Sequence, residues 1–225
     1  MKNMRLTVIT DNPKSWFIPY AEKLTAELKR DGHQVAFCTD YADVKQGDCA
    51  FLLSCERIVP KEVLSLHSHN IVVHASALPK GKGWSPMTWQ ILEGKDDVPI
   101  TLFEAAEKVD SGAVYLRDTI RFEGHELIDE LRDALGKKIV EMVLKFAGSY
   151  PKIKGEEQQG TETFYARRRP KDSEIDVNKT LAESFNQLRV VDNERYPAFF
   201  RHKGRTYVLK IEKGDPTAPK GGKER

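Results

Sequence analysis

The sequence predicts an open α/β fold with a mostly parallel sheet, followed by a small C-terminal appendage of mixed α and β structure. Three observations lead to this prediction. Short apolar segments alternate with helical patterns through the first 150 residues, as in folds built from strand–helix–strand units. The continuous apolar run 71–73 suits a strand that is buried on both faces of a parallel sheet. The character of the chain changes after Pro151, where a polar stretch begins.

The first half of the chain holds the expected parallel strands and the helices that connect them. Strands are predicted over 5–10, 35–38, 49–53 and 70–74, and helices over 15–30, 60–66 and 85–93. Apolar residues recur at helical spacing between Phe17 and Leu28, and Asp31-Gly32 ends that helix. The turn Asp11-Asn12-Pro13 follows the first strand, and two interpretations of it stay open: part of a binding site, or an ordinary Asx turn.

The second half contains two more strands, a long helix and the appendage. Strands over 100–104 and 113–122 are joined by a turn, and an amphipathic helix over 126–150 ends before Pro151. Beyond it, we expect a helix over 181–188 and strands over 198–201 and 205–211. The chain is therefore divided into a main domain over 1–150, an appendage over 151–213 and a flexible tail over 214–225.

The composition is that of a soluble globular protein and argues against several classes of function. The 225 residues carry 36 Lys and Arg against 34 Asp and Glu, whereas a dedicated nucleic-acid binder usually has a basic excess. No apolar run reaches the ~18 residues needed to cross a bilayer, and the N-terminus lacks a signal-peptide pattern. The three cysteines form no CxxC pair, so we expect free thiols, a cytoplasmic location and no metal site.

The net charge of +2 is unevenly distributed along the chain. Residues 1–150 carry a net charge of −3, and residues 151–225 carry +5. The appendage therefore holds all the positive excess, which fits a segment that lies near an anionic small molecule. The run Arg167–Arg169 is interpreted more simply, as a solvated group of charges.

The segment after the fourth strand is where chemistry is expected, because ligands of open α/β sheets bind beyond the carboxyl ends of the strands. His74 ends that strand, and the loop that follows it, 79–83, contains two glycines and two lysines. Asp110 lies 36 residues further on, in a turn. A carboxylate beside an imidazole fixes the ring tautomer and raises its basicity. His74 and Asp110 are therefore the candidate proton-transfer pair, although a lone histidine at a strand end is also commonly structural.

Several short motifs occur in the order in which one enzyme family carries them. They are Cys55–Val59, His74, Ser76, Leu78-Pro79, Lys80–Gly83, Pro86, Ile100-Thr101 and Val109–Gly112. The chain from about residue 5 to residue 147 resembles the formyltransferases that use 10-formyltetrahydrofolate, a family that acts on glycinamide ribonucleotide, methionyl-tRNA or nucleotide sugars. The resemblance implies a Rossmann-like formyltransferase fold, an N-formyltransferase activity and 10-formyltetrahydrofolate as the cosubstrate.

The resemblance also implies roles for the matching residues around the reaction. His74 accepts the proton of the attacking amine or stabilises the tetrahedral intermediate. Asp110 orients His74 and helps to relay the proton to the departing folate nitrogen. The pterin lies against Arg57, Ile58 and Val59 and against the Asp110 turn. A simpler interpretation of Arg57, as a surface residue in an ion pair, stays open.

The acceptor side is expected to involve the loop after His74. Ser76 and Trp84 are candidate contacts, with a turn cap and ordinary aromatic packing as their respective alternatives. Lys80 and Lys82 offer ammonium groups to a diphosphate, and the glycines between them let backbone N–H groups approach it.

One position departs from the family pattern. The family has an asparagine two residues before the histidine, where it donates a hydrogen bond to the formyl oxygen, and this chain has Val72 there. Loss of such a donor costs ~2.7–4 kcal/mol of transition-state stabilisation if nothing replaces it. Asn70 lies about 7 Å further back along the strand, at ~3.3 Å per residue, and is a poor substitute. A protonated His74, a loop N–H and Thr101 are the other candidates.

A nucleotide-linked amino-deoxy sugar is the acceptor that we expect, with UDP-4-amino-4,6-dideoxy-N-acetylaltrosamine as one candidate. The family members that act on tRNA resemble a longer chain, whereas only about 75 residues follow Pro151 here. The segment 188–200 resembles the sugar branch, so Arg189 and Asn193 are expected to contact the nucleotide, and the branch implies a homodimer. Three alternatives stay open: glycinamide ribonucleotide as the acceptor, a hydrolase that releases formate, and a non-catalytic folate-binding protein.

Overall fold

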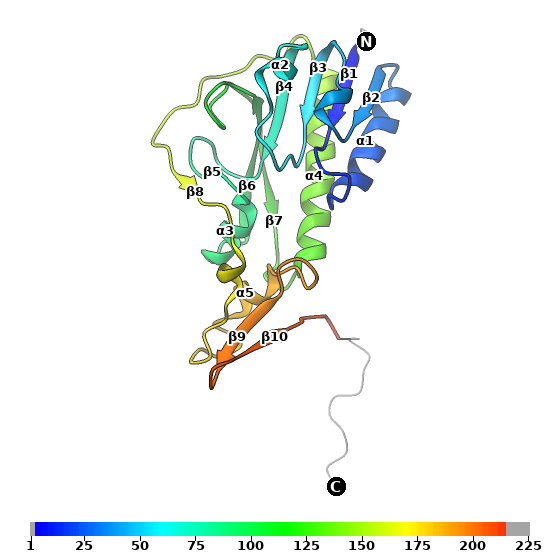
Figure 1. Cartoon of the computed structure of the whole chain (residues 1–225). Helices are drawn as coiled ribbons and strands as arrows, with labels where there is room; N and C mark the ends of the chain where they lie inside the picture. Colours follow the sequence, from blue (N-terminus) through cyan, green and yellow to red (C-terminus); the bar gives the residue numbers. More distant parts are fainter. Residues whose placement is uncertain (1–2, 215–225) are drawn as a thin grey trace.

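The computed structural model describes residues 3–214, and Figure 1 shows a large α/β part above a smaller C-terminal part. The centre of the large part is a six-stranded sheet with the order β2-β1-β3-β4-β6-β7. Its strands are β1 (Arg5–Ile9), β2 (Gln34–Cys38), β3 (Gly47–Leu52), β4 (His67–His74), β6 (Asp97–Glu104) and β7 (Val114–Arg121). The predicted α/β fold class with a mostly parallel sheet is confirmed.

The sheet has a parallel half and an antiparallel half. Strands β1 to β4 pair in parallel, and β6 and β7 run antiparallel to their neighbours. The carboxyl ends of β1, β3 and β4 therefore lie at the same edge of the sheet. At that edge, His74 at the end of β4 pairs with Thr101 of β6.

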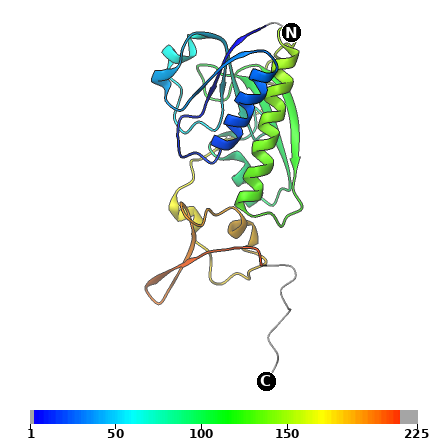
Figure 2. The ribbon, with the colours of Figure 1, turned by 90° about the vertical axis from the view of Figure 1, so that its right-hand side faces the viewer.

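Two helices, α1 (Ile18–Arg30) and α4 (Ile128–Ser149), lie side by side against one face of the sheet, as Figure 2 shows. The Tyr20 hydroxyl of α1 donates a 2.8 Å hydrogen bond to the Asp133 carboxylate of α4. Burial, together with that carboxylate, raises the pKa of Tyr20 to about 12. A Cβ atom at Gly136 would lie 2.7 Å from the Tyr20 ring, so a glycine lets α1 approach α4 closely.

The core has two layers because successive strand residues point to opposite faces of the sheet. Leu6, Val8 and Phe51 face the layer that α1 and α4 cover, where Phe51 packs edge-on against Phe146 of α4. Ile9, Ala50 and Leu52 face the other layer, which includes Val63 of the short helix α2 (Lys61–Leu64). The loop after His74 contains β5 (Lys82–Gly83), and helix α3 (Pro86–Leu92) follows it. These layers fix the strands whose ends carry the candidate site.

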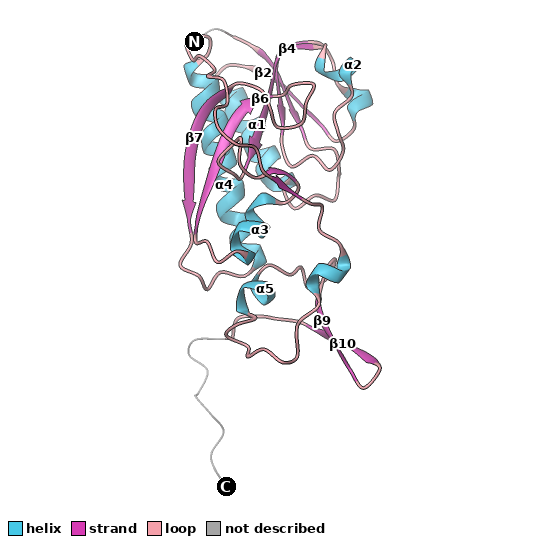
Figure 3. Ribbon diagram, turned by 90° about the vertical axis from the view of Figure 1, so that its left-hand side faces the viewer, coloured by secondary structure: helices cyan, strands magenta, loops and turns pink. Residues whose placement is uncertain are grey.

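The C-terminal part is small and has its own apolar cluster. It contains β8 (Phe164–Tyr165), a 3-10 helix (Pro170–Ser173), α5 (Phe185–Arg189), β9 (Ala198–His202) and β10 (Arg205–Leu209). Its core residues are Ile175, Leu188, Val191 and Ala198. The hairpin β9–β10 projects from it, as Figure 3 shows. The helix predicted over 181–188 is wrong in its bounds, because 181–184 form turns and only five residues are helical.

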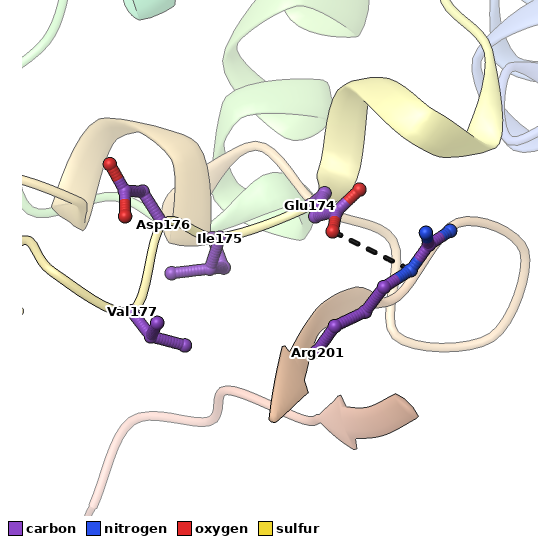
Figure 4. Close-up of a pocket in the computed structure, with 5 residues that line it drawn as sticks. All are labelled: Glu174, Ile175, Asp176, Val177 and Arg201. Carbon is purple, nitrogen blue, oxygen red and sulfur yellow. Dashed lines mark ion pairs between the residues drawn. The ribbon is translucent and has the colours of Figure 1, made fainter. Parts of the chain in front are cut away.

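The C-terminal part also bears a shallow groove lined by Glu174, Ile175, Asp176, Val177 and Arg201 (Figure 4). An ion pair of 3.6 Å between Arg201 and Glu174 crosses it. Within residues 3–214, no helix is long and apolar enough to cross a membrane. The division of the chain at residue 150 stays a prediction, and all of the predicted tail except Gly214 lies outside the described residues.

Candidate functional site

His74 and Asp110 lie together at the carboxyl end of β4. Their side chains are almost buried, at 10% and 12% exposure, and His74 Nε2 is 3.8 Å from Asp110 Oδ2. The same nitrogen is 2.8 Å from the carbonyl oxygen of Gly81. Because a carbonyl oxygen only accepts hydrogen bonds, this contact requires a proton on Nε2. The structure thus brings the predicted pair together, with the carboxylate beside a ring nitrogen that acts as a donor.

The loop 79–83 contacts both members of this pair. The Gly81 carbonyl accepts from His74, and the Gly83 N–H donates a 2.8 Å hydrogen bond to Asp110 Oδ2. Both glycines have positive φ angles, 73° and 98°, which other residues adopt only with strain. A Cβ atom at Gly83 would also collide with the Tyr165 carbonyl oxygen. The two glycines therefore let this loop contact both the imidazole and the carboxylate.

The Asp110 turn has an unusual backbone of its own. Asp110 has a φ of 51°, in the left-handed region that side chains other than glycine disfavour. At Gly112, a Cβ atom would collide with the carbonyl oxygen of Glu104, so the turn needs a glycine there. The side-chain amide of Gln158 donates hydrogen bonds of 2.9 Å to the carbonyls of both Asp110 and Gly112. A strained turn held by a distant side chain is typical of a functional site.

The two predicted phosphate-binding lysines have different surroundings. Lys80 is exposed at the start of the loop. Lys82 is 1% exposed, and its ammonium forms a 2.6 Å ion pair with Glu162. The prediction that Lys82 meets a diphosphate is therefore not supported, because its charge is buried and already neutralised by a residue 80 positions away. The contact of Lys80 with a diphosphate stays a prediction.

Ser76 and Trp84 lie on either side of the same loop. Ser76 is 1% exposed, and its hydroxyl has no hydrogen-bond partner among the described residues. Trp84 is half-buried, with the Arg167 guanidinium 4.5 Å from its ring centre. The interpretation of Arg167–Arg169 as a solvated group of charges is therefore too simple. Arg167 stacks on Trp84, and the half-buried Arg168 donates to backbone carbonyls. Both predicted acceptor contacts stay predictions.

The predicted pterin loop is held by a residue that the sequence left ambiguous. Asp11 is buried, and its carboxylate accepts hydrogen bonds from the backbone N–H groups of Glu56 and Arg57, at 2.7 and 2.8 Å. The Arg57 side chain also pairs with it at 3.2 Å, so the ion-pair interpretation of Arg57 is confirmed. Asn12 Oδ1 accepts from the N–H of Lys14, which makes 11–14 an Asx turn.

The loop 55–59 exposes an apolar side chain beside the charged Arg57. Ile58 is 75% exposed, whereas Val59 packs against the buried cluster around Ile9. Across from it, Val109 is 48% exposed beside Asp110. Lys61 and Glu107 join the two segments through a 2.6 Å ion pair. Each of the two segments thus exposes one apolar side chain that a flat, uncharged ring could contact.

The surroundings of Val72 narrow the choice of replacement for the missing asparagine. Val72 packs in an apolar cluster with Leu78 and Phe103. Asn70 donates its side-chain amide to the Leu64 carbonyl, in agreement with the expectation that it is a poor substitute for the missing asparagine. The Thr101 hydroxyl is buried and donates to the Ser76 carbonyl at 2.7 Å. The N–H groups of 80–83 already donate to Ala77, Thr163 and Asp110. The hydrogen on Nε2 of His74, which contacts the Gly81 carbonyl, is therefore the remaining candidate.

Arg189 and Asn193 make structural contacts rather than lining an open site. Arg189 is 1% exposed and pairs with Asp96 at 3.3 Å. The Asn193 side chain exchanges two hydrogen bonds with the backbone of Ile211. The prediction that these residues contact a nucleotide is therefore not supported, because their polar groups join the C-terminal part to the main sheet and to itself.

No group of three or more His, Cys, Asp or Glu side chains is arranged to hold a metal ion within residues 3–214. Two histidines of β4 make other contacts: His67 Nε2 lies 2.9 Å from the Thr7 hydroxyl, and His69 Nδ1 lies 3.0 Å from Glu104.

A family model described as "Formyl transferase" matches residues 14–145, more than half of the chain. The chain belongs to the formyl transferase family. A curated relative, methionyl-tRNA formyltransferase of Sulfurihydrogenibium, is 27% identical over 148 residues, which are 64% of this chain and 48% of the relative. The chain thus spans about half the length of the curated relatives that it matches.

Solved structures of several formyltransferases share the fold. Methionyl-tRNA formyltransferase from Clostridium thermocellum has a TM-score of 0.78 at 21% identity, with 94% of this chain and 100% of that chain covered. A sugar N-formyltransferase from a Shewanella species has a TM-score of 0.70 at 13% identity, covering 92% and 97%. HypX from Aquifex aeolicus in complex with tetrahydrofolic acid has a TM-score of 0.74 at 17% identity, covering 93% and 38%.

Sequence reasoning missed the residues that hold the site together. Gln158, Glu162 and Thr163 lie in a polar stretch that carries no periodic signal. Asp11 was noted only as part of a turn after the first strand. The available signal was its place at a parallel strand's carboxyl end, where a carboxylate can reach the loop of the neighbouring strand.

Proposed function

We propose that this chain transfers a formyl group from 10-formyltetrahydrofolate to the amine of a nucleotide-linked amino-deoxy sugar. UDP-4-amino-4,6-dideoxy-N-acetylaltrosamine or a related sugar is the acceptor that we would try first. The observation that carries the proposal is the buried His74–Asp110 pair at the carboxyl end of β4, inside the segment that matches the family. Tetrahydrofolic acid bound to HypX supports a folate as the formyl donor.

The folate would be held between the loop 55–59 and the Asp110 turn. Ile58 and Val109 offer exposed apolar surface to a flat ring, and Asp11 keeps the first of these loops in place through two backbone N–H groups. The Arg57 guanidinium, paired with Asp11, stays near the mouth. Bound there, the donor supplies an electrophilic formyl carbon, and every proton is handled by the protein.

The proposed proton transfers involve Nε2 of His74. In the free protein this nitrogen donates to the Gly81 carbonyl, with Asp110 Oδ2 3.8 Å away. When the acceptor amine attacks the formyl carbon, a C–N bond forms, and the protonated imidazole stabilises the charge on the formyl oxygen. The new ammonium then gives a proton to the Asp110 carboxylate, and the oxyanion collapses as the C–N bond to the folate nitrogen breaks. Through His74, Asp110 returns that proton to the leaving nitrogen. The products are an N-formyl sugar and tetrahydrofolate.

The charge of the C-terminal residues favours a small anionic acceptor. The net +5 of residues 151–225 and the exposed Lys80 suit a diphosphate. A sugar N-formyltransferase among the solved structures is covered along 97% of its chain, which fits the same choice. We further propose that the protein is a homodimer, a point that light scattering in solution would test.

Methionyl-tRNA is the second candidate acceptor. The specific observation in its favour is the Clostridium thermocellum protein of that name, which this chain covers along its full length. Our expectation that length disfavours tRNA is weakened accordingly. Against it stands the small net charge of +2, since binding to a polyanion is driven by many cationic contacts.

The test is a panel of acceptors incubated with protein and 10-formyltetrahydrofolate, with products analysed by mass. We expect one formyl group to be added to a nucleotide amino sugar, and to neither glycinamide ribonucleotide nor methionyl-tRNA. Formyl-methionyl-tRNA would establish the second candidate instead. Formate released without any acceptor would indicate a hydrolase, and folate binding without any product would indicate a non-catalytic protein. Each of these three results would overturn the sugar assignment.

A further inference from the structure

A segment beyond the matched domain crosses over both catalytic loops. The family model ends at residue 145, and the segment 156–165, which we call the strap, comes after it. Its first residue, Glu156, exchanges two backbone hydrogen bonds with Val114 at the start of β7. Its last two, Phe164 and Tyr165, form β8 and pair in parallel with Lys82 and Gly83 of β5. Between these anchors, three side chains of the strap reach the loops that carry or contact His74 and Asp110.

Gln158 reaches the Asp110 turn. Its amide donates to the carbonyls of Asp110 and Gly112, at 2.9 Å each, and so closes the strained part of the turn from outside. Both carbonyls accept from the Gln158 side chain, in a turn where Asp110 has a φ of 51°. The direction of the Asp110 carboxylate therefore depends on Gln158.

Thr163 reaches the other loop. Its hydroxyl oxygen accepts a 2.8 Å hydrogen bond from the N–H of Gly81, the residue whose carbonyl accepts from His74. The strap backbone adds two more hydrogen bonds to this loop, from Thr163 N–H to the Pro79 carbonyl and from Lys82 N–H to the Thr163 carbonyl. The position of the carbonyl that faces Nε2 is thus set by the strap.

Glu162 joins the two loops to each other. Its carboxylate pairs with Lys82, next to Gly81, and with Lys108, two residues before Asp110, at 2.6 and 2.8 Å. One carboxylate therefore spans the gap between the loop that contacts His74 and the turn that carries Asp110.

We propose that Gln158 and Thr163 are positioning residues, which fix the distance between His74 and Asp110 by holding their two loops against one strap. Gln158 sets the Asp110 carboxylate, and Thr163 sets the Gly81 carbonyl against which His74 rests. This inference rests on the proposed function for its kinetic consequence, but the geometry on which it depends exists in the free protein. A catalytic group misplaced by about 1 Å can lose about 100-fold in rate.

The test uses a pair of adjacent glutamines in the full chain. Gln158→Met keeps the side-chain length and removes both N–H donors, and Gln159→Met makes the same change at an exposed neighbour without a side-chain hydrogen bond. The Gly83 amide, which donates to Asp110, reports the position of that carboxylate through its hydrogen exchange, measured by NMR. We expect its exchange to be about tenfold faster in Gln158→Met and unchanged in Gln159→Met. No substrate is needed for this measurement.

Turnover gives the second readout. We expect Gln158→Met to lower kcat about 10- to 100-fold and to raise the KM for the folate donor by a smaller factor, because the variant misplaces a reacting group on a turn that also faces the donor. Wild-type Gly83 exchange in a folded Gln158→Met protein would overturn the proposal, as would wild-type kcat. If no acceptor is found, the proposed function fails while the exchange result still decides the inference.

Thr163→Val, with Thr161→Val as its matched control, decides the case if Gln158→Met fails to fold. Thr163→Val removes the acceptor of the Gly81 N–H, so we expect faster exchange at Gly81 alone. Equally fast exchange throughout the main sheet would indicate a purely structural strap and contradict the proposal.

Discussion

The two sides of the candidate site are fixed by different parts of the chain. On the donor side, the Asp11 turn holds the loop 55–59, and both lie at the ends of neighbouring parallel strands. On the reacting side, the loop 79–83 and the Asp110 turn are held by the strap, which comes after the matched domain. The loop 55–59 is thus held from the end of a neighbouring strand, whereas the loop 79–83 and the Asp110 turn are held by a segment that lies far from them in the sequence.

This difference indicates where the chain has room to vary. A buried carboxylate that accepts backbone N–H groups is a local solution, and any segment that preserves two strands preserves it. The strap, in contrast, ties the geometry of the reacting pair to the sequence that leads into the C-terminal part. Substitutions in the C-terminal part that change the acceptor can therefore alter the loop 79–83 and the Asp110 turn without disturbing the loop 55–59.

The largest expected effect comes from Gly112→Ala, which breaks the reacting side at its tightest point. The new Cβ atom would collide with the Glu104 carbonyl oxygen, so strand β6 or the turn must move. We expect the free energy of unfolding to fall by about 3 kcal/mol. Chemical denaturation would measure it, with Gly148→Ala as the control, because nothing lies within 4 Å of that position. Equal stability of the two variants would contradict this account of the turn.

Asp11→Ala is expected to break the donor side alone. Two backbone N–H groups and the Arg57 side chain lose their acceptor, so the free energy of unfolding should fall by about 2 kcal/mol. Tetrahydrofolate binding, measured by calorimetry, should weaken about tenfold, and Gly83 exchange should stay as in the wild type. The exposed Asp31→Ala is the control. Altered Gly83 exchange in Asp11→Ala would mean that the two sides are not independent.

A smaller effect is expected from pH, through Glu162. Hydrogen bonds from Lys108 and then Lys82 hold the pKa of Glu162 below its ordinary value of 4.5. Because the folded-state pKa is lowered, the stabilisation is complete above pH 4.5 and is lost as pH falls through the folded-state pKa. Solvent screening at this exposed carboxylate keeps the effect small.

Thermal unfolding of the wild type and Glu162→Gln between pH 7 and pH 3 would measure this contribution. We expect the wild type to have the higher midpoint at pH 7, and the difference to disappear at the acid end. A difference that persists unchanged to the lowest pH would argue that Glu162 acts through something other than its charge.

The smallest effect is expected where the C-terminal part meets the donor side. Arg195 and Glu56 form an exposed ion pair of 3.7 Å. Such pairs contribute about 0.5 kcal/mol or less, so Arg195→Ala should leave both the free energy of unfolding and tetrahydrofolate binding almost unchanged. A loss of binding comparable to that of Asp11→Ala would show that the C-terminal part also holds the loop 55–59 in place.

The sequence predicted what depends on local pattern. The apolar run 71–73 placed β4 correctly, and the strand-end rule then located His74 and led to Asp110. It could not predict that Lys82 is buried, because a lysine between two glycines has the pattern of an exposed cation. Its partner Glu162 is 80 residues away, in a stretch without periodicity. The prediction that Arg189 and Asn193 contact a nucleotide failed for the same reason, because residue spacing in the sequence does not show which distant residues pair.

The most direct test of the account separates donor binding from chemistry at one residue. His74→Gln removes the imidazole at the end of β4 and leaves the Asp11 turn and the loop 55–59 intact. Using the acceptor found in the panel, we predict wild-type tetrahydrofolate binding by calorimetry and a loss of formyl transfer of about 1000-fold. Formyl transfer near the wild-type rate in His74→Gln would contradict the account, because the buried pair would then not be the reacting centre.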